Sequence, residues 1–114
     1  MKSANVVAAL GALAQESRLA VFRLLVKRGP DGYSPGELAE KLQIPGPTLS
    51  FHLKELLRAE LIASRREGRS LYYSANFDAM QALIEFLTDH CCSLADQECD
   101  SACKPVASRA KRRA

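Results

Sequence analysis

Apolar residues recur at the spacing of an amphipathic helix along most of this chain. The recurrence predicts a first helix from about Ser3 to Gln15 and a second that starts near Ser17. The second helix is expected to stop at Lys27-Arg28-Gly29-Pro30, because basic residues followed by glycine and proline are typical of a helix C-terminus. A further apolar stripe predicts the last helix, from about Asp78 to His90.

Between these segments the pattern predicts two short helices joined by a tight turn. Ser34-Pro35-Gly36-Glu37 is a capping box with proline at the first helical position, and the helix that it opens ends near Leu42. After the connection Gln43-Ile44-Pro45-Gly46, Pro47 opens a second helix that runs to about Glu60. Two short helices with such a connection are the signature of a helix-turn-helix motif.

A β-hairpin is predicted directly after this motif. The segments Leu61–Arg66 and Ser70–Ala75 have the character of short strands and flank the turn Glu67-Gly68-Arg69. Arginine side chains bind phosphates well and can enter narrow minor grooves. The hairpin contains three arginines within five residues, Arg65, Arg66 and Arg69. A basic hairpin in this position is a wing. The predicted fold class is therefore mainly α with a small β-hairpin, a winged helix-turn-helix.

The helix from Pro47 to Glu60 has one apolar face, which we expect in the core, and one polar face. A polar face alone is typical of a solvated helix, but the basic hairpin beside it favours DNA contact. A helix in the major groove reads base edges with short polar side chains, and apolar groups contact thymine methyls. The predicted DNA-contacting residues, besides the three arginines, are Thr48, Ser50, Phe51, His52 and Lys54.

Charge is unevenly distributed. The net charge is +3, yet the last eleven residues carry five basic groups and no acid. Residues 41–75 carry six basic and three acidic groups, whereas residues 76–103 carry six acidic groups and no Lys or Arg. The middle segment suits a polyanion, and the tail either adds non-specific DNA affinity or is a solvated, disordered end. No apolar run is long enough to span a membrane. The apolar start, Val6 to Ala14, faintly resembles a secretory signal, but its pattern continues without a break into the second helix, so we expect a cytoplasmic protein.

Four cysteines fall within thirteen residues: Cys91, Cys92, Cys99 and Cys103. In a reducing compartment such a cluster indicates metal binding or redox chemistry. Three thiolates suit arsenite or antimonite, and four suit tetrahedral zinc. Zinc sites usually contain C-x2-C pairs, which are absent here, so the spacing favours As(III) or Sb(III). Zinc, cadmium or lead, and a redox or inert cluster, remain alternatives. No organic cofactor motif or thioredoxin-type C-x-x-C is present, and no enzyme activity is predicted.

Apolar stripes on the first and last helices are wider than one small domain easily hides, which favours a dimer over a complete monomer core. A dimer also fits DNA recognition, because one helix-turn-helix reads only a few base pairs.

The order of elements resembles the ArsR/SmtB family of metal-responsive repressors. The resemblance covers Val6 to about His90 and rests on the segments 12–19, 47–56 (PTLSFHLKEL) and 66–73. It implies a homodimer, formed through the first and last helices, that sits on a palindromic operator in double-stranded DNA and leaves it when metal binds.

Within the family, this chain resembles the arsenic-responsive branch with a vicinal cysteine pair after the last helix. That pattern implies Cys91, Cys92 and Cys99 as ligands, with Cys103 as a substitute ligand or a bystander. The expected organisation is a DNA-binding and dimerisation domain over 1–92, a metal-binding segment over 93–103 and a basic tail over 104–114.

Overall fold

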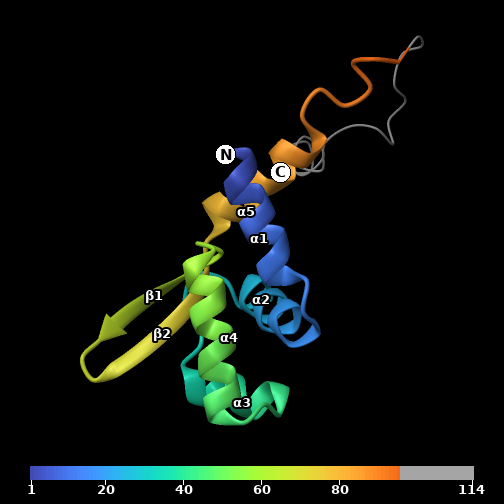
Figure 1. Ribbon diagram of the computed structural model, residues 1–114. Helices are drawn as coiled ribbons and strands as arrows, with labels where there is room; N and C mark the ends of the chain where they lie inside the picture. The colour runs from blue at the N-terminus through green and yellow to red at the C-terminus, as the bar shows by residue number, and fades with distance from the viewer. Residues whose placement is uncertain (96–114) are drawn as a thin grey trace.

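The computed structural model describes residues 1–95, and its helices stack around one end of a two-stranded hairpin (Figure 1). In chain order the elements are α1 (Ser3–Leu13), α2 (Glu16–Arg28), α3 (Pro35–Leu42), α4 (Gly46–Arg58), β1 (Ile62–Glu67), β2 (Ser70–Ala75) and α5 (Phe77–Thr88). This confirms the predicted winged helix-turn-helix. None of the helices in the described part of the chain is long and apolar enough to cross a membrane.

Side-chain caps set several helix boundaries. Ser34 Oγ accepts a hydrogen bond from the Glu37 amide at 3.2 Å, and Glu37 Oε1 accepts one from the Ser34 amide at 3.0 Å, which confirms the capping box. α1 stops at Leu13 instead of Gln15, because Gln15 caps the next helix by accepting the Arg18 amide at 2.8 Å. α5 ends at Thr88 instead of His90, and there the cap is a backbone hydrogen bond from the Asp89 amide to the Phe86 carbonyl.

The hydrophobic core lies where α2, α3 and α4 meet the start of the hairpin. Its largest fully buried side chains are Leu25, Leu38, Leu49, Leu56, Leu61 and Val21. The leucines of α4 recur at helical spacing, so their burial turns the opposite side of that helix toward solvent.

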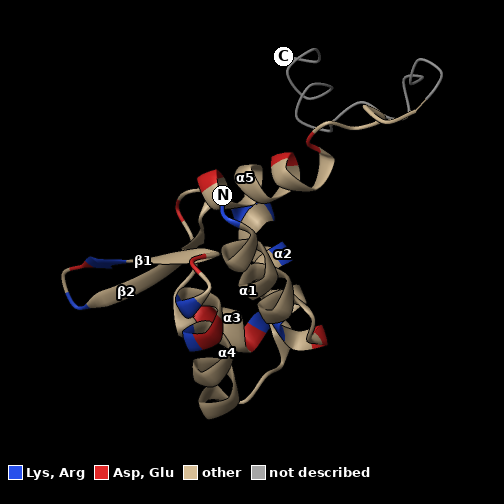
Figure 2. Cartoon of the chain, turned by 45° about the horizontal axis from the view of Figure 1, so that its top comes forward, with Lys and Arg blue, Asp and Glu red and all other residues tan. Residues whose placement is uncertain are grey.

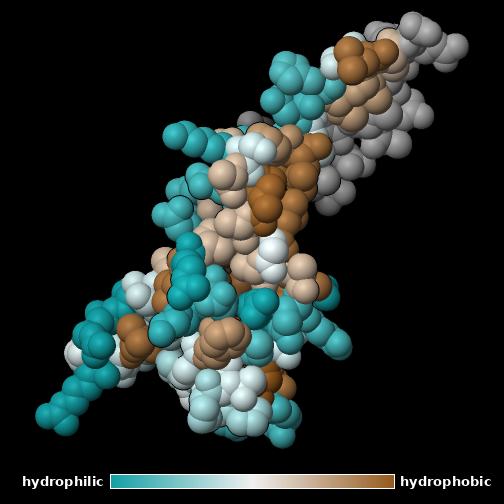
Figure 3. All heavy atoms as spheres, viewed as in Figure 1, coloured by the Kyte–Doolittle hydropathy of each residue, from teal (hydrophilic) through white to brown (hydrophobic). Residues whose placement is uncertain are grey.

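α1 and α5 pack together and keep large apolar side chains in solvent. On α1, Val7 is 67 % exposed and Leu10 is 42 % exposed; on α5, Phe86 and Leu87 are 40 % and 58 % exposed. Figure 3 shows hydrophobic residues gathered over this part of the surface. We call these four residues the apolar face. Contiguous exposed apolar surface of this kind marks an interaction site.

The hairpin is held at its base by a backbone segment that the sequence pattern did not predict. β1 and β2 are antiparallel, with Ile62 opposite Ala75 and Glu67 opposite Ser70. Next to β2, the Tyr33 amide donates to the Tyr73 carbonyl at 2.9 Å, and the Tyr73 amide donates back to the Tyr33 carbonyl at 2.8 Å. The loop between α2 and α3 therefore extends the hairpin at one point.

Gly32 permits this contact, and replacing it is expected to be costly. A Cβ at Gly32 would lie 2.2 Å from the Tyr73 carbonyl oxygen, and its φ is +72°. Gly32→Ala should therefore lower the free energy of unfolding by about 3 kcal/mol, the sum of backbone strain and overpacking. Gly68→Ala is the matched control, because its φ is +61° but its Cβ meets nothing within 4 Å. In urea denaturation, Gly68→Ala should lower the free energy of unfolding by only about 1 kcal/mol. Equal losses of stability in the two variants would contradict the close-packing argument.

Candidate nucleic-acid interface and cysteine segment

The outward side of α4 carries four of the predicted DNA-contacting residues. Thr48, Ser50, Phe51 and Lys54 are all exposed, and Phe51 is 56 % exposed despite being aromatic. α3 and α4 are joined through Gln43, whose left-handed φ of 55° makes the turn tight. The opposite side of α4 is packed into the core, so this helix is held rigidly with its polar side outward.

His52 is a correction to the sequence-based prediction. It is only 6 % exposed, and within the described structure its Nδ1 atom has no hydrogen-bond partner. It therefore does not lie on the exposed side of α4 with Thr48 and Phe51. Burial lowers the pKa of the imidazole, and the nearby positive charge of Arg18 lowers this pKa further. His52 is thus a neutral core residue.

The depressed pKa of His52 makes stability depend on pH. Below about pH 6.5 the unfolded chain takes up a proton that the folded protein resists, so the free energy of unfolding should fall as the pH drops from 7.5 to 5.5. The slope contributed by one group is at most about 1.4 kcal/mol per pH unit. His52→Leu should flatten this dependence in chemical denaturation. His90→Gln, a change at an exposed histidine, should retain it; the reverse pattern would contradict this assignment.

The wing, residues 62–75, presents two of its three arginines freely. Arg66 and Arg69 are exposed, and Figure 2 shows Lys and Arg positions toward the end of the hairpin away from the body. Among the described residues neither has an acidic partner within 4 Å. Both guanidinium groups are therefore available for phosphate.

Arg65 is placed differently. Its two terminal nitrogens donate to the carbonyls of Pro30 and Asp31 at 3.2 and 3.1 Å, and its Nε donates to Glu67 Oε1 at 2.9 Å. Its guanidinium also stacks over the Tyr72 ring, 5.0 Å from the centroid. Arg65 thus fastens the wing to the loop between α2 and α3. The sequence indicated its charge but not this role.

Two basic residues near this loop were not predicted as site residues. Arg28 and Lys41 both lie over the Tyr33 ring, with their cationic groups 5.0 and 5.3 Å from its centroid. They come from different helices, so no local pattern in the sequence joins them. Their exposed position beside the base of the wing adds positive charge to the same region.

The vicinal cysteines follow α5 on a series of turns. The Cys91 amide donates to the Thr88 carbonyl at 3.1 Å, and Cys92 has a left-handed φ of 63°. The Cys91 thiol is free and exposed, and its sulfur lies 3.7 Å from that of Cys92. Cys92 is disulfide-bonded in this structure.

The proposed metal-binding set is only partly covered by the structure. Cys99, Cys103 and the basic tail lie outside the described residues, which end at Ala95. Within residues 1–95 no three Cys, His, Asp or Glu side chains are arranged to hold a metal ion. The cysteine ligand set therefore stays a prediction.

Comparison with known proteins places the chain in a family. A family model described as a helix-turn-helix domain matches residues 13–65. Over 73 residues the chain is 41 % identical to the uncharacterized HTH-type transcriptional regulator YceK of Bacillus subtilis, covering 64 % of this chain and 72 % of the relative. Over 101 residues it is 33 % identical to the arsenical resistance operon repressor of Staphylococcus aureus, covering 84 % of this chain and 86 % of the relative.

A solved structure agrees in fold. It is the homodimeric winged helix-turn-helix DNA-binding domain of a possible ArsR-family regulator from Mycobacterium bovis, with a TM-score of 0.61 and 26 % identity. The match covers 83 % of this chain and 88 % of that one. The chain belongs to the ArsR/SmtB family of helix-turn-helix transcriptional regulators, which are DNA-binding proteins and not enzymes.

Proposed function

We propose that this protein is a repressor that binds operator DNA as a homodimer and is released by As(III) or Sb(III). The observation that carries the DNA-binding part is the outward side of α4. Thr48, Ser50, Phe51 and Lys54 are exposed on a helix whose other side is fixed in the core. We assign α4 to the major groove, where hydroxyl groups meet base edges and Phe51 meets a thymine methyl.

The apolar face supports the homodimer. Val7, Leu10, Phe86 and Leu87 lie on the two helices that form the predicted interface, and all are exposed in the single chain. Association of two copies would remove this surface from water. The related structure from Mycobacterium bovis is described as homodimeric. Two α4 helices in one dimer then read two half-sites about one turn of DNA apart.

The sulfur geometry supports the inducer. Two sulfurs that bind one ion lie no farther apart than twice a metal–sulfur bond, about 4.6 Å for a 2.3 Å bond. Cys91 and Cys92 meet this condition at 3.7 Å. A disulfide sulfur carries no thiolate charge, so the site requires Cys92 in its reduced form. Cys99 completes the proposed ligand set, with Cys103 as a substitute ligand or a bystander. The relative from Staphylococcus aureus is an arsenical resistance operon repressor.

Selection from random-sequence DNA duplexes tests the DNA-binding part directly. The reduced protein should enrich a palindrome whose two half-sites are centred about ten base pairs apart. Enrichment of a single half-site would contradict the dimeric reading mode. Absence of any enriched sequence would contradict operator recognition itself.

Substitutions in the wing should distinguish an arginine that contacts DNA phosphates from one that holds the wing in position. Arg69→Gln removes one free cation, so the salt dependence of operator binding should weaken by about one unit of slope. Arg65→Gln removes the fastening to Pro30 and Asp31; it should weaken binding but leave the slope of log Kd against log salt nearly unchanged. Fluorescence anisotropy at several salt concentrations measures both. A loss of slope in Arg65→Gln would show that Arg65 contacts phosphate after all.

A further inference from the structure

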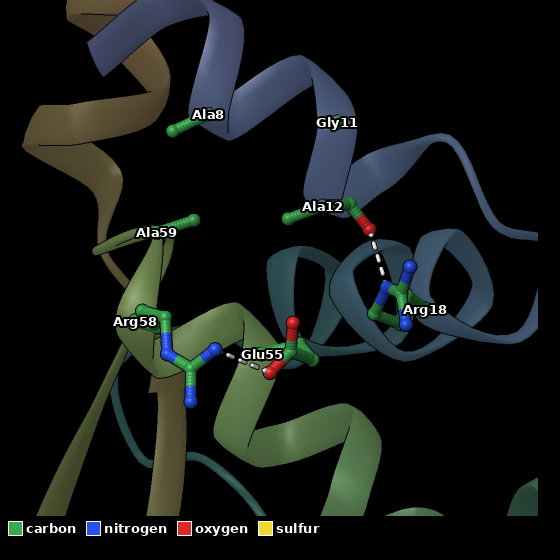
Figure 4. Close-up of a pocket in the computed structure, with 7 residues that line it drawn as sticks. All are labelled: Ala8, Gly11, Ala12, Arg18, Glu55, Arg58 and Ala59. Carbon is green, nitrogen blue, oxygen red and sulfur yellow. Dashed lines mark hydrogen bonds and ion pairs between the residues drawn. The ribbon is translucent and has the colours of Figure 1, made fainter. Parts of the chain in front are cut away.

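A small cavity lies between α1, the start of α2 and the second half of α4. Its volume is about 260 Å³, near the lower end of the range for small-molecule sites. Small residues line it from two sides, Ala8, Gly11 and Ala12 from α1 and Ala59 from the end of α4, and its charged wall consists of Arg18, Glu55 and Arg58. In Figure 4, Ala8 and Ala12 extend from α1, Ala59 lies opposite them, and Arg18 approaches from α2.

The charged wall has one positive group without a counter-ion. Glu55 Oε2 pairs with Arg58 Nη1 at 3.2 Å, so these two charges offset each other. The Arg18 guanidinium is half-buried, and its Nε donates to the Ala12 carbonyl at 2.7 Å. Within residues 1–95 no carboxylate lies within 4 Å of Arg18. Arg18 is one of the residues that line the cavity, and among the described residues no acceptor is bound to its two terminal nitrogens.

The buried side chain whose pKa Arg18 influences is His52, which is a histidine and not an anion. His52 lies on the same flank of α4 as Ala59 and is 6 % exposed, and its Nδ1 has no hydrogen-bond partner within residues 1–95. Burial, and after it the positive charge of Arg18, lowers the pKa of this imidazole, so His52 adds no second cation. The region is thus positively charged and partly desolvated. In such surroundings the attraction between a carboxylate and a guanidinium is stronger than it is in water.

We propose that this cavity binds a small organic carboxylate with a compact apolar body. The carboxylate accepts hydrogen bonds from the two terminal nitrogens of Arg18, a planar donor pair that matches its two oxygens. The apolar body lies against the methyl groups of Ala8, Ala12 and Ala59. α1 carries part of the apolar face and α4 is the proposed reader helix, so a bound ligand touches both. This site is separate from the cysteines and needs neither DNA nor metal.

Benzoate is a suitable probe, and benzamide is its uncharged counterpart. In NMR titrations of the full-length reduced protein, benzoate should shift the methyl resonances of Ala8, Ala12 and Ala59 saturably. The Kd should be on the order of 1 mM for a ligand of this size. The methyl group of Ala63, an exposed residue of β1, should not move. Benzamide should bind about tenfold more weakly, because it forms no charge-assisted pair.

Variants distinguish benzoate binding in the cavity from non-specific attraction of benzoate to surface arginines. Arg18→Gln should weaken benzoate binding about tenfold, whereas Arg23→Gln, at an exposed residue of the same helix, should not. Ala8→Leu fills the cavity from an exposed position of α1 without changing a charge, and should abolish binding. Equal shifts with benzamide, equal weakening by Arg23→Gln, or no shift because a second copy covers the cavity would each overturn the proposal.

Discussion

Leu87→Glu is expected to convert the protein from a dimer to a monomer and to lower its operator affinity about 10²- to 10⁴-fold. Leu87 is 58 % exposed on α5 within the apolar face, and a carboxylate buried there in the dimer would be desolvated without a partner. The loss of affinity follows because linked half-sites gain from effective concentration, which a monomer lacks. Sedimentation velocity and anisotropy measure the two effects.

Leu19→Glu is the matched control for this experiment. Leu19 is 42 % exposed, but it lies on α2, outside the apolar face. This variant should stay dimeric and keep its operator affinity. If Leu87→Glu remains dimeric while Leu19→Glu dissociates, the interface lies elsewhere. A monomeric Leu87→Glu with unchanged affinity would show that dimerisation does not matter for DNA binding.

Arsenite is expected to release the reduced protein from its operator, with affinity falling roughly 5- to 150-fold, the usual range for coupling between two sites. Cys91→Ser and Cys92→Ser should abolish this response and leave DNA binding without arsenite unchanged. Their side chains lie beyond α5 and away from the outward side of α4. Cys103→Ser decides whether the fourth cysteine is a ligand.

The choice of metal is tested in the same anisotropy assay. Antimonite should act like arsenite, whereas zinc, cadmium and lead should be weaker inducers, because the cysteine spacing lacks the C-x2-C pairs typical of zinc sites. Wild-type responses in both single variants would contradict the sensor assignment. Zinc held tightly at one equivalent per chain in the purified protein would instead indicate a structural site.

Local patterns predicted most of the fold. The leucines of α4, the capping box at Ser34 and the glycine turn at Gly68 each encode an element within a few residues, and all three appear in the structure. The exposed part of the proposed DNA-binding surface followed from the same pattern. Once Leu49, Leu53 and Leu56 are buried, helical geometry alone turns Thr48 and Phe51 outward.

The two site residues with unexpected surroundings depend on distant contacts. On a helical wheel His52 stands at the edge of the buried stripe, and the structure places it inside the core, where the charge of Arg18 from α2 influences it. Arg65 is fastened to carbonyls 34 and 35 positions away in the sequence. No periodicity within α4 or β1 encodes either contact. For the cysteines, spacing limits the chemistry but leaves their arrangement in space undetermined.

The end of α5 at Thr88 has an evolutionary consequence. Residues 91–95 follow α5 and are exposed apart from the half-buried Cys92, and none of these five residues belongs to the hydrophobic core. Substitutions there are free of the packing constraints that govern Leu49 or Leu56. On the proposed function, a lineage can therefore gain, lose or exchange an inducer by changing this short segment, while the proposed DNA-binding surface evolves under separate selection.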